Sequence, residues 1–286
     1  MAFTLAHIAA ALPLKRVRWL HFDALVIGTL LPDLPYYIDG SNTVRDLSHQ
    51  WLGIISYCLP WGLGIFTIWL WLFKPAVKAL IHPWYLSSNN LNILFFSPLS
   101  RFLSKKNRAV ESCSWLQVKF IFCLSVVLAL IGGALTHLVW DGITHPDGFI
   151  AIRSAWLQSS LYISQLNETI TIARLLQYIS SILGLLILLG FASYKLYNYN
   201  AIKADNSLTR SDSKLKRWNS ILIIVLIFTN ALYWGWHKAS ESWHFVKVDN
   251  YTFLAQVSTS FMQGAFFALI IYIVIYQIYH HIFCTS

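Results

Sequence analysis

The sequence predicts an all-α, polytopic integral membrane protein with about six transmembrane helices. Hydrophobic residues make up 57% of the 286 residues and charged residues only 12%, whereas a soluble domain carries about 25% charged residues. Several apolar stretches are long enough to cross about 30 Å of hydrocarbon. Many of the 13 tryptophans and 14 tyrosines lie near the ends of these stretches, as in the aromatic belts of membrane proteins.

Each predicted span is a long apolar stretch bounded by polar residues or turn signals. The first is the weakest, because it contains His21, Asp23 and Asp33 and ends in a proline-rich turn. Ahead of it, the apolar residues 1–14 predict a short amphipathic or re-entrant helix that carries His7. The six predicted spans are residues 20–38, 51–73, 119–141, 175–197, 218–237 and 253–279.

The whole chain, residues 1–286, is predicted to form a single membrane domain. Residues 1–150 hold the polar motifs described below. Residues 151–286 form a second hydrophobic, helical half, which contains a polar linker at residues 198–217. The chain shows no convincing internal repeat, and its oligomeric state is not indicated by any pattern.

The formal net charge of +9 is distributed unevenly along the chain. Lysines and arginines gather before the first predicted span, in the long loop 74–118 and in the linker 198–217, whereas the connections 32–50 and 146–174 hold few. The positive-inside rule then places both termini in the cytoplasm. Because this bias accounts for the basic charge, no nucleic-acid partner is expected, and the expected partner is the lipid bilayer.

The most informative motif is GGALTHLVWDGITH, at the end of the third predicted span. His137, Asp141 and His145 are spaced i, i+4 and i+8, which places two imidazoles and a carboxylate on one helix face. An ionisable group inside a span costs about 2.5–3.5 kcal/mol on insertion scales and usually faces a cavity, a partner or an ion. His and Asp are also common zinc ligands. The motif therefore predicts a polar, metal-binding site, with a neutral His–Asp packing contact as the alternative.

Further polar side chains fall on the same predicted side of the membrane. Asp33 follows Pro32, where it either contributes to the site or caps a turn. His49 precedes the second predicted span and is either part of the site or an interfacial residue. His145 precedes a proline, where a helix must end, so we expect it to orient a ligand rather than to bind metal. Three more acids lie in the same connections: Asp39, Asp46 and Asp147.

His7 poses a conflict. It lies in the apolar segment TLAHIAAA, which favours a polar role for its side chain, but the basic residues that follow should hold this end of the chain near the cytoplasm. For His7 to join the other polar groups, residues 1–14 must enter the membrane, or the site must lie deeper than the span boundaries suggest. The sequence leaves this question open.

A second group of polar residues lies near the end of the fifth predicted span. His237, Glu241 and His244 share one helix face, and three tryptophans surround them. This setting is typical of a membrane interface, so an interfacial role is favoured. The chain contains no Walker loop, no dinucleotide-binding fingerprint, no HExxH and no GxSxG, which removes the commonest soluble enzyme classes.

Four segments taken in order resemble the DUF4184 family of bacterial membrane proteins: MAFTLAHIAAALPL, DALVIGTLLPDLPYY, SHQWLG and GALTHLVWDGITH. More distantly they resemble membrane-bound metal-dependent hydrolases of the YdjM type. The resemblance implies His7, Asp33, His49, His137 and Asp141 as the polar set, and a bacterial inner-membrane location. This sequence departs from the hydrolases after Pro32-Asp33, where the second acid and histidine are missing, and around His49.

The leading hypothesis is a metal-dependent hydrolase that cuts a phosphodiester or ester in a lipid or envelope molecule. His7, His49, His137 and Asp141 would bind a divalent metal, Asp33 would be a further ligand or the general base, and His145 would orient a ligand. The mixed nitrogen and oxygen ligands suit Zn²⁺ best without excluding Mn²⁺ or Fe²⁺. The competing hypotheses are a non-enzymatic protein whose site handles protons or ions or binds metal structurally, and a helix-packing network without a ligand.

Overall fold

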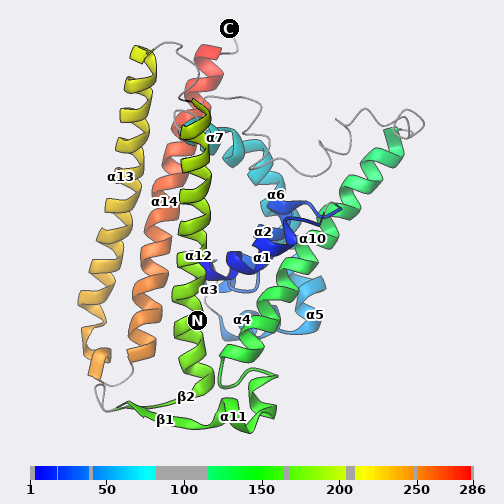
Figure 1. Cartoon of the computed structure of the whole chain (residues 1–286), viewed down its shortest axis with the longest axis vertical. Coiled ribbons are helices and arrows are strands. Elements are labelled where there is room, and N and C mark those ends of the chain that lie inside the picture. Colours follow the sequence, from blue (N-terminus) through cyan, green and yellow to red (C-terminus); the bar gives the residue numbers. More distant parts are fainter. Residues whose placement is uncertain are drawn as a thin grey trace. The chain divides into compact units, whose positions relative to one another are not determined.

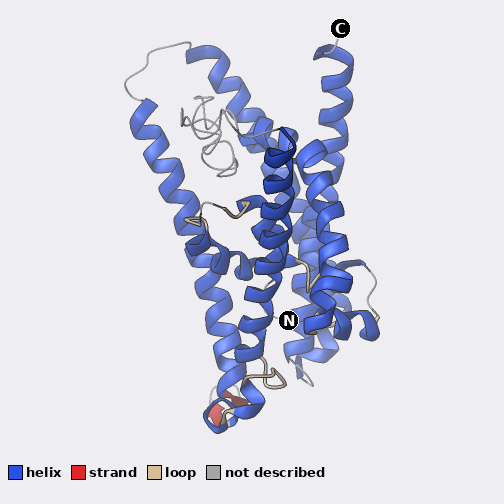
Figure 2. Ribbon diagram, turned by 90° about the vertical axis from the view of Figure 1, so that its right-hand side faces the viewer, coloured by secondary structure: helices blue, strands red, loops and turns tan. Residues whose placement is uncertain are grey.

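The computed structural model describes residues 4–17, 19–38, 41–81, 115–163, 168–203, 210–247 and 250–284. Within these ranges nearly all of the chain is helical, and one small two-stranded sheet is the exception (Figures 1 and 2). The predicted all-α membrane architecture is confirmed. Most of the predicted basic loop 74–118, part of the linker 198–217 and Asp39 lie outside the described residues.

Five helices among the described residues are long and apolar enough to cross a membrane: Trp51–Ile81, Leu116–Thr144, Ile172–Tyr194, Trp218–Glu241 and Asn250–Ile282. Four of them are single α-helices, α10 (Trp115–Thr144), α12 (Ile172–Lys203), α13 (Arg210–Glu241) and α14 (Asn250–Cys284). The first span is assembled from α5 (Trp51–Gly53), η2 (Ile54–Cys58), α6 (Leu59–Ile68), η3 (Trp69–Phe73) and α7 (Lys74–Ile81).

The two π-helical turns of the first span, η2 and η3, have a local cause. Each lies just before a proline, Pro60 or Pro75, in the chain. A proline lacks the N–H that would bond to the carbonyl four residues earlier, and its ring crowds that carbonyl. In both cases that carbonyl belongs to the π-helical turn, so the helix widens there and continues across the membrane.

Residues 20–38 do not form the predicted first span. They fold into α2 (Phe22–Leu30), a turn, and α3 (Pro35–Ile38). A helix of nine residues is about 14 Å long, less than half of the hydrocarbon thickness. Pro32 and Pro35 end α2 and start α3, because neither proline can donate the hydrogen bond that would continue α2. The hydropathy of residues 20–38 suggested a sixth span, but the two prolines interrupt the helix.

The chain before α2 forms a short apolar helix, as predicted. It consists of η1 (Thr4–His7) and α1 (Ile8–Leu14), which are too short to cross a membrane. Both pack against α2 and α10, and Ala6 and Ala11 are fully buried in these contacts. Lys15, just beyond α1, lies over the rings of Phe22 and Phe191. His7 therefore reaches the interior because its helix is inserted beside two longer ones.

Helices α2 and α10 approach closely because small residues face each other. A Cβ atom on Gly133 would lie 2.7 Å from the backbone nitrogen of Thr29 and 2.8 Å from the carbonyl carbon of Gly28. A Cβ atom on Gly28 would in turn lie 3.0 Å from the Cα atom of Gly133. Paired small residues of this kind allow helix backbones to touch inside a membrane. This contact sets the position of the turn that follows α2.

The connection after α10 carries the only sheet in the described chain. It contains η5 (Ala151–Arg153), α11 (Ala155–Gln158) and the antiparallel strands β1 (Ser160–Ile163) and β2 (Glu168–Thr171), with Ser160 opposite Thr171. Ala151, Leu157 and Ala173 form a small hydrophobic core in this part of the chain. Before the first span, α4 (Asn42–Ser48) leads directly to His49.

The chain divides into two compact units, which we describe separately. The first comprises residues 1–66 and 92–193 and holds α1, α2 and α10. The second comprises residues 67–91 and 194–286. In the second unit α13 and α14 pair along their length, Asn230 donates a hydrogen bond to the carbonyl of Gly264, and Tyr272 donates one to the carbonyl of Ala76. The 3₁₀ turn η6 (Trp243–Lys247) lies between α13 and α14.

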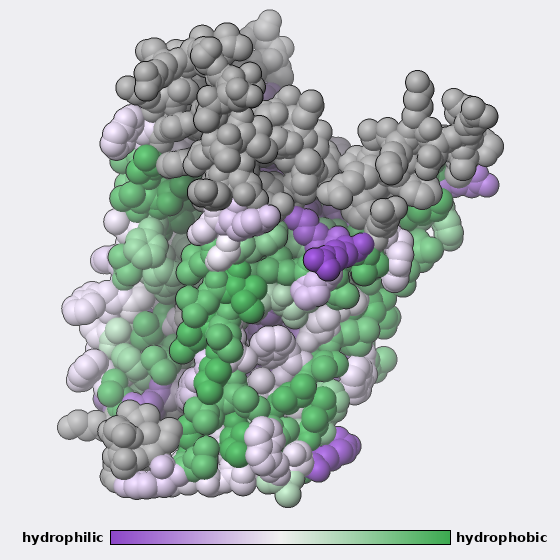
Figure 3. Space-filling view, in the orientation of Figure 1, coloured by the Kyte–Doolittle hydropathy of each residue, from purple (hydrophilic) through white to green (hydrophobic). Residues whose placement is uncertain are grey.

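Large apolar side chains cover much of the surface of the spanning helices. Hydrophobic residues dominate the described face seen in Figure 3. On α12, for example, Leu186 and Leu189 are more than half exposed. A soluble protein rarely exposes apolar patches of this extent, whereas a bilayer covers them with lipid chains, so the lipid bilayer is the environment of the molecule.

The close contact between α2 and α10 can be tested with two neighbouring glycines. We expect Gly133→Ala to lower the free energy of unfolding by about 1–3 kcal/mol, because the new methyl group must push two backbones apart. The matched control is Gly132→Ala, whose Cβ atom would lie 3.7 Å from Leu25 in ordinary contact. Alanine favours a helix over glycine, so the control should be neutral or stabilising. Denaturation of the detergent-solubilised protein, followed by circular dichroism, measures both, and equal stabilities would contradict the packing.

Candidate metal centre

Six histidine and aspartate side chains of the first unit converge at one place, although they come from four separate parts of the chain. His7 ends η1, Asp33 lies in the turn after α2, and His49 follows α4. His137, Asp141 and His145 come from the last turns of α10 and the residue after it. We call these six residues the His/Asp cluster.

Four members of the cluster form a group with the composition of a metal site. Asp33, His49, His137 and Asp141 each offer one donor atom, and the four atoms lie within 4.8 Å of one another. The Nε2 atom of His137 is 3.2 Å from Oδ2 of Asp141 and 3.7 Å from Oδ1 of Asp33. The Nε2 atom of His49 is 3.5 Å from Oδ1 of Asp33 and 3.9 Å from Oδ2 of Asp141.

The backbone fixes the orientation of the His137 ring. Its Nδ1 atom lies 2.8 Å from the carbonyl oxygen of Thr29, which can only accept a hydrogen bond, so Nδ1 carries the proton. The carbonyl is available because α2 ends at Leu30, before the N–H of Asp33 could bond to it within the helix. The other nitrogen, Nε2, therefore directs a lone pair toward the carboxylates of Asp33 and Asp141 unless a second proton occupies it.

His49 is oriented in the same way. Its Nδ1 atom donates to the carbonyl oxygen of Arg45 at 2.9 Å, which again leaves Nε2 facing the two carboxylates. The hydroxyl of Ser48 donates to the carbonyl oxygen of Pro32 at 2.7 Å and so ties α4 to the turn that carries Asp33. Metal-binding histidines in proteins almost always donate their second ring nitrogen to a carbonyl or carboxylate, and both rings of this group do so.

Asp33 is buried and held by the N-terminal segment. The hydroxyl of Thr4 donates a hydrogen bond of 2.6 Å to its Oδ2 atom, and the hydroxyl of Tyr37 donates one of 3.0 Å to Thr4. Burial raises the pKa of this carboxyl, but the nearby imidazole of His137 and the hydrogen bond with His49 outweigh burial and hold the pKa well below its usual range. Asp33 is therefore a carboxylate at neutral pH.

His7 lies beside the four-residue group. Its ring stacks on that of His137, with centroids 3.9 Å apart, and its Nε2 atom is 3.4 Å from Oδ1 of Asp141. Both of its ring nitrogens are buried without a hydrogen-bond partner among the described residues. Burial, followed by the charge of His137, lowers the pKa of His7 to about 4, so its imidazole is neutral. The structure thus brings His7 to the cluster, although it lies outside the group of four donors.

One ring nitrogen of His145 contacts Gln177, and the other faces the cluster. Arg174 donates to Oε1 of Gln177 at 2.7 Å, which identifies the remaining amide atom as the nitrogen, and this nitrogen lies 2.8 Å from Nε2 of His145. The proton of His145 is therefore on Nδ1, which is 3.5 Å from Oδ1 of Asp141. Burial lowers the pKa of His145, which favours the neutral ring. His145 is placed to orient Asp141 through a chain that starts at Arg174.

Exposure divides the cluster into a closed and an open side. His7, Asp33 and His137 are at most 3% exposed, whereas the exposed fractions of Asp141, His145 and His49 are 13%, 19% and 26%. For His49, burial lowers the pKa, but the hydrogen bond and charge of Asp33 outweigh it and raise the pKa above its ordinary value. A ligand that reaches the cluster approaches past the three partly exposed side chains.

The other polar residues singled out in the sequence do not join the cluster. Asp46 and Asp147 are exposed, and Asp39 lies outside the described residues. His237 and Glu241 form an ion pair of 3.4 Å in which both side chains are more than half exposed. This pair belongs to the second unit of the chain.

Several residues that support the cluster carry no signal in the sequence. Thr4, Ser48 and Gln177 are buried and make the hydrogen bonds described above. Hydroxyl and amide side chains occur throughout the chain, and their hydrogen bonds span 16 to 32 residues. Thr4 lies in the segment MAFTLAHIAAALPL and Ser48 in SHQWLG, but nothing in either segment distinguishes these hydroxyls from other polar side chains.

Comparison with known proteins identifies the family of the chain. A family model described as a domain of unknown function, DUF4184, matches residues 1–274. The chain therefore belongs to the DUF4184 family. No curated protein and no solved structure matches it.

The hold of the N-terminal segment on Asp33 is testable by removing one hydroxyl. We expect Thr4→Val to lower the free energy of unfolding by about 1.5–3 kcal/mol, because the buried carboxylate of Asp33 loses the hydrogen bond that Thr4 donates to it. The control is Thr229→Val, since the exposed hydroxyl of Thr229 bonds only to the carbonyl of Leu226 in its own helix. Chemical unfolding in detergent compares the two, and a Thr4 variant as stable as the control would refute the assigned hydrogen bond.

Proposed function

We propose that this protein is a membrane-bound, metal-dependent hydrolase that cuts a phosphodiester or ester in a lipid or envelope molecule. The observation that carries the proposal is the convergence of two carboxylates and two imidazole nitrogens, one donor atom from each of Asp33, His49, His137 and Asp141. Both imidazoles are oriented by backbone carbonyls so that Nε2 faces the carboxylates.

The distances between donor atoms fit a metal ion. In a tetrahedral site with metal–ligand distances of about 2.0–2.1 Å, neighbouring donors lie about 3.3–3.4 Å apart. The four nitrogen–oxygen distances of the group are 3.2, 3.5, 3.7 and 3.9 Å. Nε2 of His137 is buried without a hydrogen-bond partner among the described residues. A cation at the centre would satisfy this nitrogen, which otherwise remains unpaired.

The donor set indicates which metal would bind. Two nitrogens and two carboxylate oxygens suit Zn²⁺, and Mn²⁺ or Fe²⁺ accept the same ligands. When bound, such a metal would supply an activated water and would polarise the bond to be cut. His7 would be a further ligand after a small shift, or it would cover the inner side of the site through its stack on His137.

The residues of the chain divide the remaining tasks. Asp33 is proposed first as a ligand, because one of its oxygens is held by Thr4 and the other faces both imidazoles. A role as general base would require that second oxygen to reach a water instead. Arg174, Gln177 and His145 would hold Asp141 in the orientation that presents Oδ2 to the metal.

The depth of the cluster supports a lipid or envelope substrate. His137 and Asp141 lie seven and three residues before the end of α10 at Thr144, which corresponds to about 10 Å and 5 Å along the helix. With the end of α10 at the membrane surface, as we propose, these groups would lie at the depth where head groups join acyl chains. Arg45 lies beside the open side, with its guanidinium 4.6 Å from the ring of Tyr36, and Tyr36 contacts His49. A cation in this place favours an anionic phosphodiester over a neutral ester.

The distribution of basic residues supports an orientation in a bacterial inner membrane. We propose that the loop 74–118, the linker 198–217 and the C-terminus are cytoplasmic, by the positive-inside rule. The His/Asp cluster, which lies before the first span and at the end of the second, would then face the periplasm. The cytoplasmic placement of the N-terminus was inferred from a span over residues 20–38 and loses that support, because α2 is too short.

Metal content is the direct test of the site. We expect near-stoichiometric zinc or manganese in the detergent-purified protein, and its loss in His137→Asn and Asp141→Asn, because each removes one donor of four. Asp147→Asn, which changes an exposed carboxylate two residues after His145, is the matched control and should keep the metal. Mass spectrometry of folded protein measures this, and no metal in the wild type after reconstitution would remove the enzyme and the structural-metal hypotheses together.

A measurement of enzymatic turnover then separates the hydrolase from a non-enzymatic protein that binds metal. Hydrolysis of phospholipid or ester substrates that disappears with a chelator, and in both cluster variants, would support the hydrolase. A protein that contains metal but hydrolyses no substrate would favour the non-enzymatic alternative, in which the cluster carries ions or binds metal structurally.

The chain from Arg174 to Asp141 makes a separate prediction. We expect Gln177→Leu to weaken metal binding about 10–100-fold without removing the site, because the amide fixes the ring of His145 but binds no metal itself. Gln256→Leu is the control, since Gln256 accepts a hydrogen bond from Ser242 in the second unit. Competition against a fluorescent zinc chelator measures both affinities. Equal affinities in the two variants would show that His145 does not depend on this chain.

A further inference from the structure

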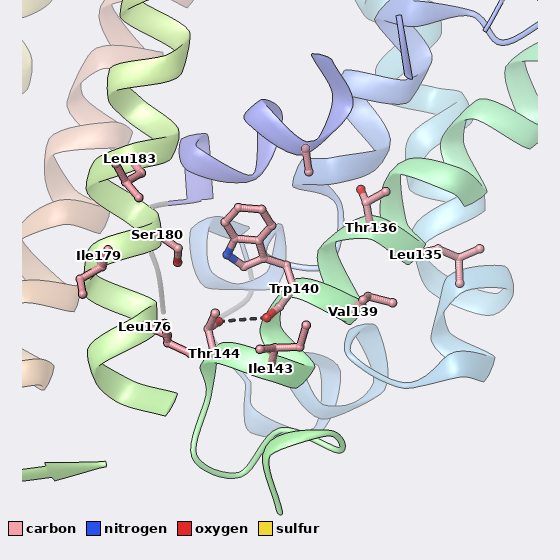
Figure 4. A pocket seen from close by; sticks show the side chains of 11 residues that line it. Leu135, Thr136, Val139, Trp140, Ile143, Thr144, Leu176, Ile179, Ser180 and Leu183 are labelled. Atoms are coloured by element: carbon pink, nitrogen blue, oxygen red, sulfur yellow. Dashed lines mark hydrogen bonds between the residues drawn. The ribbon is translucent and has the colours of Figure 1, made fainter. Parts of the chain in front are cut away.

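An apolar groove lies beside the cluster in the first unit. It has a volume of about 590 Å³ and is bounded by α10, α12 and α1. Figure 4 shows Trp140 in the middle of the groove, with Leu176, Ile179 and Leu183 of α12 on one side and Val139 and Ile143 of α10 on the other. Pockets of this volume accommodate ligands of lipid-chain or drug size.

The hydroxyl groups that line the groove are already engaged. Its three hydroxyls belong to Thr136, Thr144 and Ser180, and each donates a hydrogen bond to a carbonyl of its own helix, of Gly133, Trp140 and Gln177 respectively. The rest of the lining is aliphatic apart from the ring of Trp140, whose indole N–H is a single donor. The groove therefore offers mainly hydrocarbon contact, which suits an apolar ligand.

The groove opens toward the surface that the bilayer covers. Val139, Ile179 and Leu183 line it and are 42%, 43% and 52% exposed. They belong to two helices long and apolar enough to span a membrane. In this environment the apolar material that reaches the groove is the hydrocarbon chain of a lipid.

Every wall of the groove also leads to a residue that belongs to the cluster or supports it. On α1, Ala10 lines the groove, and His7, one turn earlier at the end of η1, belongs to the cluster. On α12, Ser180 lines the groove, and Gln177 binds His145.

On α10, the groove residue Trp140 lies next to Asp141 in the chain, and the two residues point to adjacent faces of the helix. The Trp140 ring also contacts the ring of His7 edge-on, with centroids 6.0 Å apart. A molecule with one end in the groove therefore has its other end within reach of the cluster.

We propose that this groove binds one acyl chain of a membrane phospholipid and so presents its head-group linkage to the His/Asp cluster. This inference rests on the proposed function. It narrows the substrate of that function to a lipid that enters laterally from the bilayer. The acyl chain lies along α10 and α12, and the ester or phosphodiester end reaches the partly exposed side chains of Asp141, His145 and His49. Trp140 separates the apolar part of the site from the polar part.

The test uses the full-length protein in vesicles of phosphatidylethanolamine and phosphatidylglycerol doped with a phospholipid that carries a diazirine in one acyl chain. After illumination, mass spectrometry locates the crosslinks. We expect them to concentrate on the peptides of α10 and α12 that line the groove. In Ile179→Trp, the indole occupies part of the groove, and crosslinking there should fall about tenfold, which corresponds to about 1.4 kcal/mol.

The matched control is Ile182→Trp, on the same helix but not among the groove-lining residues, and it should leave groove crosslinking unchanged. Leu183→Trp is a second groove variant, in case Ile179→Trp does not fold, and unchanged metal content shows that each variant retains the cluster. Crosslinks spread evenly over groove and outer face, or unaffected by either groove variant, would overturn the proposal. Exclusion of the probe from the wild-type groove would also overturn it, because another occupant, such as a helix of a second copy, would then cover the groove.

The crosslinking result is independent of catalysis. A protein that fails to hydrolyse lipids but crosslinks in the groove refutes the proposed function and keeps the lipid site. A protein that binds metal and hydrolyses its substrate, but does not crosslink there, refutes the groove and keeps the proposed function.

Discussion

The first unit is organised around two carboxylates, Asp33 and Asp141, that share one largely buried site. Neither could remain charged there alone, because removing an ion from water costs several kcal/mol even after the protein relaxes. Three imidazoles, those of His7, His49 and His137, and one hydroxyl, that of Thr4, lie around them. Backbone carbonyls of α4 and α2 then hold two of these imidazoles, those of His49 and His137, in place. Several parts of the chain thus meet at the cluster, and the charged groups that they carry there stabilise one another.

The short length of α2 makes this meeting possible. A helix that continued through Pro32 would use its last carbonyls internally and would carry Asp33 away along its axis. Because α2 ends there, the carbonyl of Thr29 is available to His137, and the turn directs Asp33 toward α10. The contact between Gly28 and Gly133 brings the two helices close enough for both interactions. The early end of α2 therefore both prevents residues 20–38 from crossing the membrane and positions the groups of the site.

Much of this arrangement could be predicted from the sequence, and the remainder has identifiable physical reasons. The spacing of His137, Asp141 and His145 defines one helix face whatever the surroundings, so their common direction follows from helix geometry. That Asp33 and His49 would join them followed from the predicted topology and from resemblance to a family, and that His7 would join them followed from the resemblance alone. Hydropathy averages over a window and misses the effect of one proline, which is why residues 20–38 were expected to cross.

The supporting residues could not be found in this way. Gln177 lies 32 residues after His145 and in the half of the chain without motifs, and the hairpin β1–β2 between them has no strong alternating pattern. A hydrogen bond of this kind depends on where two helices come to rest after folding. His7 illustrates the same limit. The positive charge of Lys15, which follows it in the chain, suggested that this segment lies at the membrane surface. In the structure, the ammonium group of Lys15 instead lies over the rings of Phe22 and Phe191.

The position of α1 connects the polar and apolar parts of the first unit. Because η1 and α1 together are too short to cross a membrane, they are free to lie against two longer helices, with His7 toward the cluster and Ala10 toward the groove. Ala6 touches Gly184 of α12 so closely that a Cβ atom on Gly184 would lie 2.8 Å from the Cβ atom of Ala6. The N-terminal segment therefore contacts α2, α10 and α12 together. It follows that one segment, Thr4–Leu14, takes part in both the cluster and the groove.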